Sequence, residues 1–193
     1  MMNLPVEFLS SLDGVPGFDR AAFEAVHTDG VQVTSVRVNP GKWDSGSGGV
    51  AEHFGGGETR RGDGGGVDLP GRIERVPWSS NGYYLPERPF FTFDPLFHAG
   101  AYYVQEASSM FIEQALRQTT DLARPLRVLD LCAAPGGKST LLQSLLSADS
   151  LLVCNEVIRS RANILQENMV KWGGANVVVT SNDPHDLGRL ENF

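Results

Sequence analysis

The sequence predicts an α/β protein, in which a small α+β module precedes the first half of a doubly wound, Rossmann-like sheet. Apolar runs at residues 128–131, 151–154 and 177–180 have the length and aliphatic content of buried strands. Helical periodicity fills the two intervals between them, which is the alternation typical of a parallel sheet.

A glycine turn follows the first of these runs and leads into a helix expected over residues 138–146. Such a turn exposes main-chain N–H groups at the positive end of a helix and carries little side-chain bulk. A negatively charged or carboxylate-bearing cofactor can therefore lie against its backbone. The turn consists of Cys132, Ala133, Ala134, Pro135, Gly136, Gly137 and Lys138.

Two kinds of cofactor loop compete for this turn. The phosphate-binding loop requires G-x-x-x-x-G-K-[ST], and Gly137-Lys138-Ser139 supplies its second half. Its first glycine would fall at Cys132, and Pro135 removes an N–H that a phosphate would need. The sequence favours the alternative, the first loop of an S-adenosylmethionine-dependent methyltransferase.

Acidic residues follow the next two predicted strands. Glu156 stands about 20 residues beyond the glycine turn, where an acid typically binds a ribose. It could equally be a solvated residue opening the helix expected over 157–172, and spacing alone does not decide. Asp183 follows the third run and can form an Asx-type turn before Pro184. Asp130, inside the first strand, can orient the loop or bind the cofactor.

Residues 1–100 form the predicted α+β module. Helices are expected over 5–12 and 18–27, a strand over 31–38 and another over 76–85, interrupted by Pro77. Half of the chain's 22 glycines lie between Gly46 and Gly71. Residues 44–71 are therefore expected to be a mobile loop, because they hold few apolar side chains to offset their ordering entropy. Six aromatic residues between Phe90 and Tyr103 favour a hydrophobic hinge over a base-stacking surface.

Composition restricts the class of protein. The chain is 41% hydrophobic and 20% charged, as globular proteins are, and no apolar run approaches the ~18 residues of a membrane span. Two isolated cysteines give no disulfide framework, which suits the cytoplasm, and His98 has no metal-ligand partner at useful spacing, so no metal site is expected. The net charge of −7 does not by itself indicate RNA binding.

The glycine turn, residues 132–138, resembles the cofactor loop of the Sun (Fmu) family of RNA cytosine-C5 methyltransferases. The segment Tyr102-Tyr103-Val104-Gln105-Glu106-Ala107-Ser108-Ser109 also resembles one just upstream in that family, and the likeness extends from about Val76 to Asp183. It implies S-adenosyl-L-methionine as cofactor, held by residues 132–138, with its ribose at Glu156 and its adenine at Asp183. It also implies RNA, ribosomal RNA in particular, as substrate.

The resemblance indicates what this chain lacks. In the family, one cysteine adds to C6 of the cytosine and a second assists release; they lie in a Pro-Cys segment after the fourth strand and a Thr-Cys segment after the fifth. Neither dipeptide occurs here, and Cys132 and Cys154 fit neither place. We therefore expect residues 101–193 to be a methyltransferase domain truncated after its third strand and inactive alone. The alternatives are a methyltransferase with another substrate, and a non-catalytic nucleoside- or RNA-binding remnant.

Overall fold

The computed structural model describes residues 4–29, 33–43, 49–54, 57–60 and 72–189, and the chain divides into two compact units, Met1–Val33 and Thr34–Phe193. The first unit is a helix pair, α1 (Val6–Leu12) and α2 (Arg20–Asp29), close to the expected spans. The ring of Phe23 on α2 lies 6.3 Å from that of Phe8 and 5.4 Å from that of Phe18, so aromatic packing joins the two helices.

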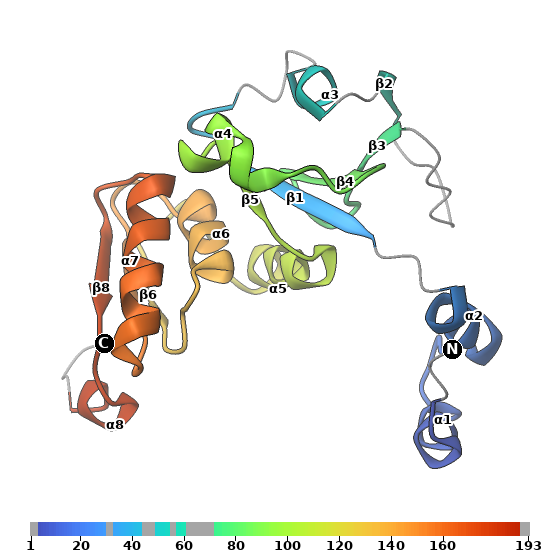
Figure 1. Ribbon diagram of the computed structural model, residues 1–193. Coiled ribbons are helices and arrows are strands. Elements are labelled where there is room, and N and C mark those ends of the chain that lie inside the picture. The colour runs from blue at the N-terminus through green and yellow to red at the C-terminus, as the bar shows by residue number, and fades with distance from the viewer. Residues whose placement is uncertain (1–3, 30–32, 44–48, 55–56, 61–71, 190–193) are drawn as a thin grey trace. The chain divides into compact units, whose positions relative to one another are not determined.

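The second unit begins with a five-stranded sheet, called here the first sheet, in the order β2-β3-β4-β1-β5 (Figure 1). Its strands are β1 (Thr34–Val38), β2 (Gly57–Arg60), β3 (Arg72–Arg75), β4 (Gly82–Leu85) and β5 (Tyr102–Val104). Every residue of β1 is buried, because both faces of this central strand are covered. Val36 and Val38 enter the sheet's own core, whereas the Arg37 side chain donates a hydrogen bond to Thr140, outside this sheet.

Two expectations for this sheet were wrong in part. The strand expected over 76–85 is only β4, because Pro77 lies in the turn that joins β3 to β4. Within the stretch expected to be a loop, 44–71, helix α3 (Gly49–Phe54) places Val50 in the core beside Phe54 and Trp43, and β2 pairs with β3. The rest of that stretch, 44–48, 55–56 and 61–71, lies outside the described residues.

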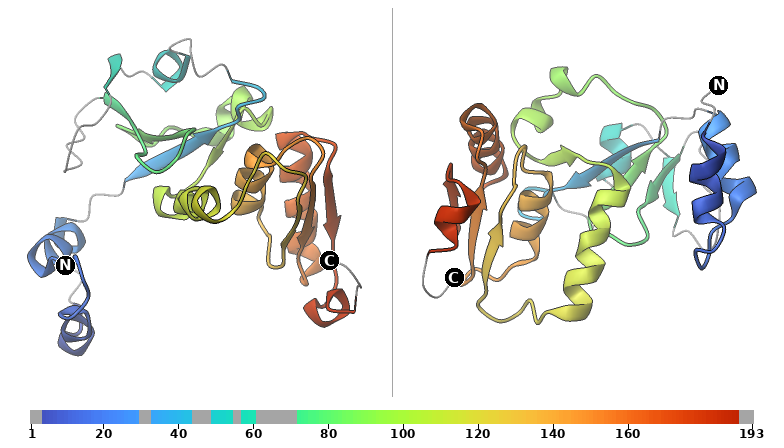
Figure 2. Two further views of the ribbon diagram at one scale, coloured as in Figure 1. Left: turned by 180° about the vertical axis from the view of Figure 1, so that it is seen from behind. Right: turned by 90° about the horizontal axis from the view of Figure 1, so that it is seen from below.

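The parallel sheet of the prediction is present, with strand order β6-β7-β8. Its strands are β6 (Arg127–Asp130), β7 (Leu151–Asn155) and β8 (Val177–Thr180), joined by α6 (Gly137–Leu145) and α7 (Arg159–Trp172). Both helices cover one face of the sheet (Figures 1 and 2), and Leu142, Leu165 and Met169 pack there on Leu152 and Cys154. This arrangement is the first half of a doubly wound sheet.

The boundary expected at residue 100 does not separate the two sheets. Strand β5 follows that residue, yet it pairs antiparallel with β1 in the first sheet. The connection back to the parallel sheet runs through η2 (Ala107–Phe111) and α5 (Ile112–Thr119), and η1 (Phe91–Phe93) and α4 (Pro95–His98) precede β5. Phe91 and Tyr102 lie in the first sheet's core rather than in a hinge, whereas Phe90 and Phe93 are exposed. No helix in the described ranges is long and apolar enough to span a membrane.

Candidate functional site

The loops that follow the three parallel strands meet at one edge of the sheet, and Asn155 joins them there. Its side chain is fully buried at the end of β7. The amide Nδ2 donates to the carbonyls of Leu131 (3.3 Å) and Asn182 (3.0 Å), and Oδ1 accepts from the Asn182 N–H and the Thr180 hydroxyl. The three expected cofactor segments are therefore held together, by a residue that sequence reasoning did not single out.

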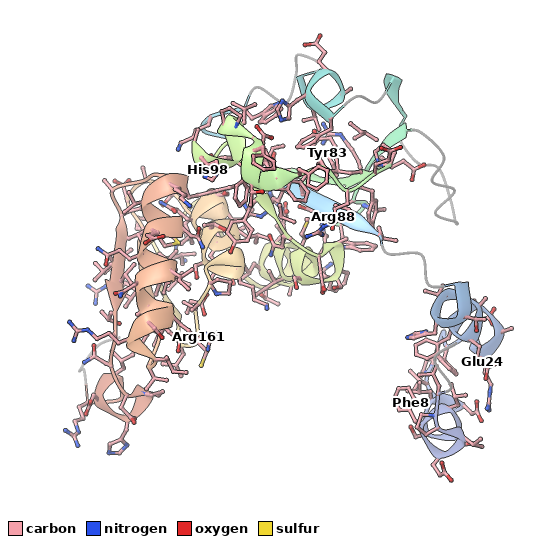
Figure 3. The ribbon with its side chains drawn as sticks, viewed as in Figure 1. Phe8, Glu24, Tyr83, Arg88, His98 and Arg161 are labelled. Carbon is pink, nitrogen blue, oxygen red and sulfur yellow. The ribbon has the colours of Figure 1, made fainter. Side chains whose placement is uncertain are left out.

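Glu156, the next residue, is 3% exposed, and its carboxylate is held by contacts with two residues. Its Oε1 accepts from the Ile158 N–H at 3.0 Å, and its Oε2 lies 3.2 Å from Nη1 of Arg161. Arg161, near the start of α7 (Figure 3), also donates from Nη2 to the Ala134 carbonyl at 2.9 Å. A carboxylate has about four acceptor positions, so two remain for a ligand such as a ribose diol.

The glycine turn is tied to α7 as well. The carbonyl of Pro135 accepts from Asn168 Nδ2 at 2.7 Å and from the Tyr103 hydroxyl at 3.4 Å. Gly136 caps α6 with a φ of 111°, a left-handed conformation that favours glycine. A Cβ at Gly136 would point to Leu165 and Asn168 on α7, so this glycine serves the turn and the packing of α7.

An unpartnered donor lies beside the next glycine. Gln105, which is 7% exposed, has an Nε2 with no hydrogen-bond partner among the described residues. A Cβ at Gly137 would come within 3.7 Å of this nitrogen and 3.4 Å of the Tyr103 ring. A buried donor without a partner is costly. The position beside the first turn of α6 therefore suits a ligand acceptor.

Arg37 on β1 donates hydrogen bonds to α6, and sequence reasoning did not single it out either. Its side chain is 1% exposed, lies over the Trp172 ring at 4.4 Å, and donates to Gln105 Oε1 at 2.9 Å and to the Gly137 carbonyl at 3.2 Å. Burial lowers the pKa of Arg37 to about 9. The guanidinium stays charged at neutral pH and fixes the helix that begins at the glycine turn.

The remaining candidates are placed as follows. Asp183 follows β8, caps α8 (Pro184–Leu187), and accepts from the His185 N–H at 2.8 Å, so the expected Asx-type turn is present and leaves one carboxylate oxygen for other contacts. Asp130 accepts from the Ser139 hydroxyl at 2.8 Å, which is an orienting role. Lys138 is exposed, and no acidic partner for it lies among the described residues.

The two cysteines differ in environment. Cys132 is exposed in the glycine turn, whereas Cys154 is fully buried on β7. Burial raises the pKa of the Cys154 thiol from 9.0 to about 11. The Cys154 thiol therefore lacks the activated, accessible setting of a nucleophile that adds to a base. Within the described residues, no group of three or more His, Cys, Asp or Glu side chains could hold a metal ion.

A parallel sheet with a glycine turn after its first strand and a buried acid after its second is the arrangement of Rossmann-like domains that bind a nucleoside cofactor. Two protein-family models match the chain and together cover more than half of it: the N-terminal domain of 16S rRNA methyltransferase RsmF at residues 67–107, and 16S rRNA methyltransferase RsmB/F at residues 116–190. The chain belongs to this family, the Sun (Fmu) family expected from the sequence. The assignment also excludes the phosphate-loop interpretation.

Curated relatives and solved structures agree with this assignment. Ribosomal RNA small subunit methyltransferase F of Shewanella denitrificans is 36% identical over 60% of this chain, and its namesake in Serratia proteamaculans is 34% identical over 63%. The matched region spans about a quarter of each relative, 24% and 26%. A methyltransferase homologue from Pyrococcus horikoshii shares the fold over 96% of this chain and 59% of its own, with a TM-score of 0.65 and 25% identity. The structure of NSun6 from Pyrococcus horikoshii with SFG gives a TM-score of 0.64 at 17% identity, over 95% of this chain and 66% of its own.

Proposed function

We propose that this chain carries the S-adenosyl-L-methionine site of a methyltransferase that acts on C5 of cytosine in RNA, ribosomal RNA in particular. The observation that carries the proposal is the connection, through Arg161, of the buried Glu156 to the glycine turn. A ribosomal RNA substrate is supported by the names of the relatives and agrees with the cytoplasmic location expected from the sequence.

The residues present fit this cofactor. The main chain of residues 132–137 would line the methionine part, with Lys138 available for its carboxylate, and the unpartnered Nε2 of Gln105 offers a donor nearby. The two free acceptor positions of Glu156 suit the ribose, and Asp183 has one oxygen left for the adenine. When bound, the cofactor supplies an electrophilic methyl group.

Methyl transfer to cytosine also needs a thiolate that adds to C6, and this chain offers none in a suitable place. Cys154 is buried and its pKa is raised, while Cys132 belongs to the proposed cofactor turn. The proposal therefore assigns cofactor binding to this chain and no catalytic residue. The 193-residue chain alone should not methylate RNA.

Calorimetry with S-adenosylhomocysteine tests the site. Glu156→Gln should weaken binding by about 1–3 kcal/mol, because it removes the charge from the ribose hydrogen bonds. Glu167→Gln, on the exposed side of α7, is the matched control and should bind like the wild type. Equal affinity of both variants would refute the assignment. If the full-length protein binds S-adenosylhomocysteine but does not methylate RNA, the result would instead favour the alternative of a non-catalytic nucleoside- or RNA-binding remnant.

A further inference from the structure

A cavity of about 180 Å³ lies between β5 and the C-terminal half of α7. It is separate from the proposed cofactor site, since none of residues 132–138, Glu156 or Asp183 lines it. Four aromatic residues, one amide and one ammonium group contribute to its wall: Phe97, Tyr102, Tyr103, Trp172, Asn168 and Lys171.

The size and lining of the cavity select a class of ligand. Pockets for drug-sized ligands run from about 300 Å³ upward, so this one accommodates a single flat ring system rather than a whole nucleotide. Aromatic walls favour stacking with such a ring. The Lys171 ammonium lies 6.0 Å from the Phe97 ring and is only partly buried, so it can meet an anionic group that remains outside.

The walls are fixed before any ligand arrives. The Trp172 indole donates to the Ser144 hydroxyl at 3.1 Å and is stacked against Arg37, and the Tyr102 hydroxyl donates to Asp94 at 2.5 Å. Gly100 lets the backbones meet, because a Cβ there would lie 2.1 Å from the Lys171 carbonyl. A preformed pocket loses little conformational freedom on binding.

The cavity also adjoins the glycine turn. Asn168 and Tyr103 both line it, and both donate to the Pro135 carbonyl, at 2.7 and 3.4 Å. A ligand in the cavity would therefore touch the two side chains that hold the turn.

We propose that this cavity binds one unstacked base of the RNA strand, with the neighbouring phosphate at Lys171. The proposal rests on the proposed function, because it takes RNA as the substrate. Single-stranded RNA is typically recognised by bases stacked on aromatic side chains, with positive charge at the backbone.

The test uses the four nucleoside 5′-monophosphates as probes and follows quenching of tryptophan fluorescence. Wild-type protein should bind at least one of them, and ribose 5-phosphate, which lacks a base, should not bind. Val104→Phe places a larger side chain at the cavity wall and should weaken binding about tenfold or more, the value of one stacked base. Lys171→Met should weaken it roughly threefold to fivefold, as expected for one exposed ion pair. Arg159→Met, an exposed cation at the other end of α7, should have no effect.

A parallel titration with S-adenosylhomocysteine separates the two proposals. Its binding should be unchanged in Val104→Phe and Lys171→Met, and it should not displace the nucleotide. If S-adenosylhomocysteine binds but none of the nucleotides does, the cavity proposal fails and the proposed function stands. Displacement of the nucleotide by S-adenosylhomocysteine would also overturn the cavity proposal. So would equal nucleotide affinity in Val104→Phe, Lys171→Met and the control Arg159→Met. If circular dichroism shows folded protein that binds neither probe, both proposals fail.

Discussion

A hydrogen bond from Arg37 to Thr140 links the first sheet to helix α6, directly after the proposed cofactor turn. Nη2 of Arg37 donates to Oγ1 of Thr140 at 2.6 Å, and that hydroxyl donates in turn to the Gly136 carbonyl at 2.8 Å. A residue of β1 thus reaches the Gly136 carbonyl through one hydroxyl group, in addition to its direct hydrogen bond to the Gly137 carbonyl. The distance along the chain is about a hundred residues, so only the folded protein makes this connection.

Replacement of this arginine should destabilise the second unit. Arg37→Met leaves the Gln105 Oε1 and two α6 acceptors buried without their donor, and we expect a loss of about 2–4 kcal/mol. Urea unfolding measures the loss, and Arg124→Met, at an exposed site, is the control. A variant within about 0.5 kcal/mol of wild type, the usual effect of a surface change, would show that Arg37 is not a structural link.

Arg161 should matter to the cofactor more than to folding, since its side chain is half exposed. Arg161→Met removes the ion pair with Glu156 and the hydrogen bond to Ala134, so affinity for S-adenosylhomocysteine should fall roughly tenfold, about 1.4 kcal/mol. Calorimetry checks this value, with Arg159→Met as the matched control. Loss of unfolding stability equal to the loss of affinity would contradict a role in positioning.

Glu113 should make the fold sensitive to acid. Burial by itself would raise the pKa of this carboxyl, but hydrogen bonds from Ser80, Arg117 and Ser79 offset it and hold the pKa below the ordinary 4.5. A carboxyl with a lowered folded pKa contributes stability above its unfolded pKa, and the contribution is lost as pH falls through the folded value. Wild type should therefore lose stability below about pH 5 more steeply than Glu113→Gln does. Parallel pH profiles of the two proteins would disprove this.

The two thiols should react at very different rates. At pH 8, Ellman's reagent should label the exposed Cys132 quickly, and Cys154 only after denaturation, because burial raises its pKa to about 11. Cys132→Ser should abolish the fast phase. S-adenosylhomocysteine should slow that phase in wild type if the turn lines the cofactor; an unprotected Cys132 in the presence of saturating ligand would count against it.

Strand β6 should promote self-association of the 193-residue chain. Within the described residues β6 pairs only with β7, and a cavity of about 300 Å³ lined by leucines of α5, α6 and β6 lies beside it. An open strand edge next to apolar surface favours pairing with another chain. Sedimentation should show concentration-dependent association that Leu122→Lys reduces and Val170→Lys, a distant exposed site, does not. A monomer at all concentrations would contradict the prediction.

The parallel half of the fold could be predicted because its signals are local. Each of the strands β6, β7 and β8 appears in the sequence as a continuous apolar run, although only β7 is largely buried, and the glycine turn marks the start of α6. Helix α7 and its stop at Gly173 follow the same logic. Glu156 and Asp183 were placed by their position after strands, which parallel topology brings to one edge.

What the sequence did not reveal depends on distant contacts. Helix α3 is six residues long in a glycine-rich stretch, and it is stabilised by packing of Val50 and Phe54 against the first sheet. Strand β5 is too short to show a period and exists because β1 pairs with it. Arg37 alternates with valines like any exposed strand residue, so nothing in its neighbourhood indicates burial. Asn155 and Arg161 owe their roles to partners more than one element away.

Strand β5 has a practical consequence for anyone who shortens or recombines this protein. Asn39 donates to the carbonyls of Gly100 (3.0 Å) and Trp172 (2.8 Å), so its side chain holds the backbone at residue 100 to the end of α7. A chimaera joined there would take β5 from one parent and its neighbour β1 from the other. Arg37 of one parent would then have to donate its hydrogen bonds to helix α6 of the other parent. Exchange between relatives should instead be made ahead of Thr34, the residue at which the second compact unit begins, so that each parent keeps its matched set of buried donors and acceptors.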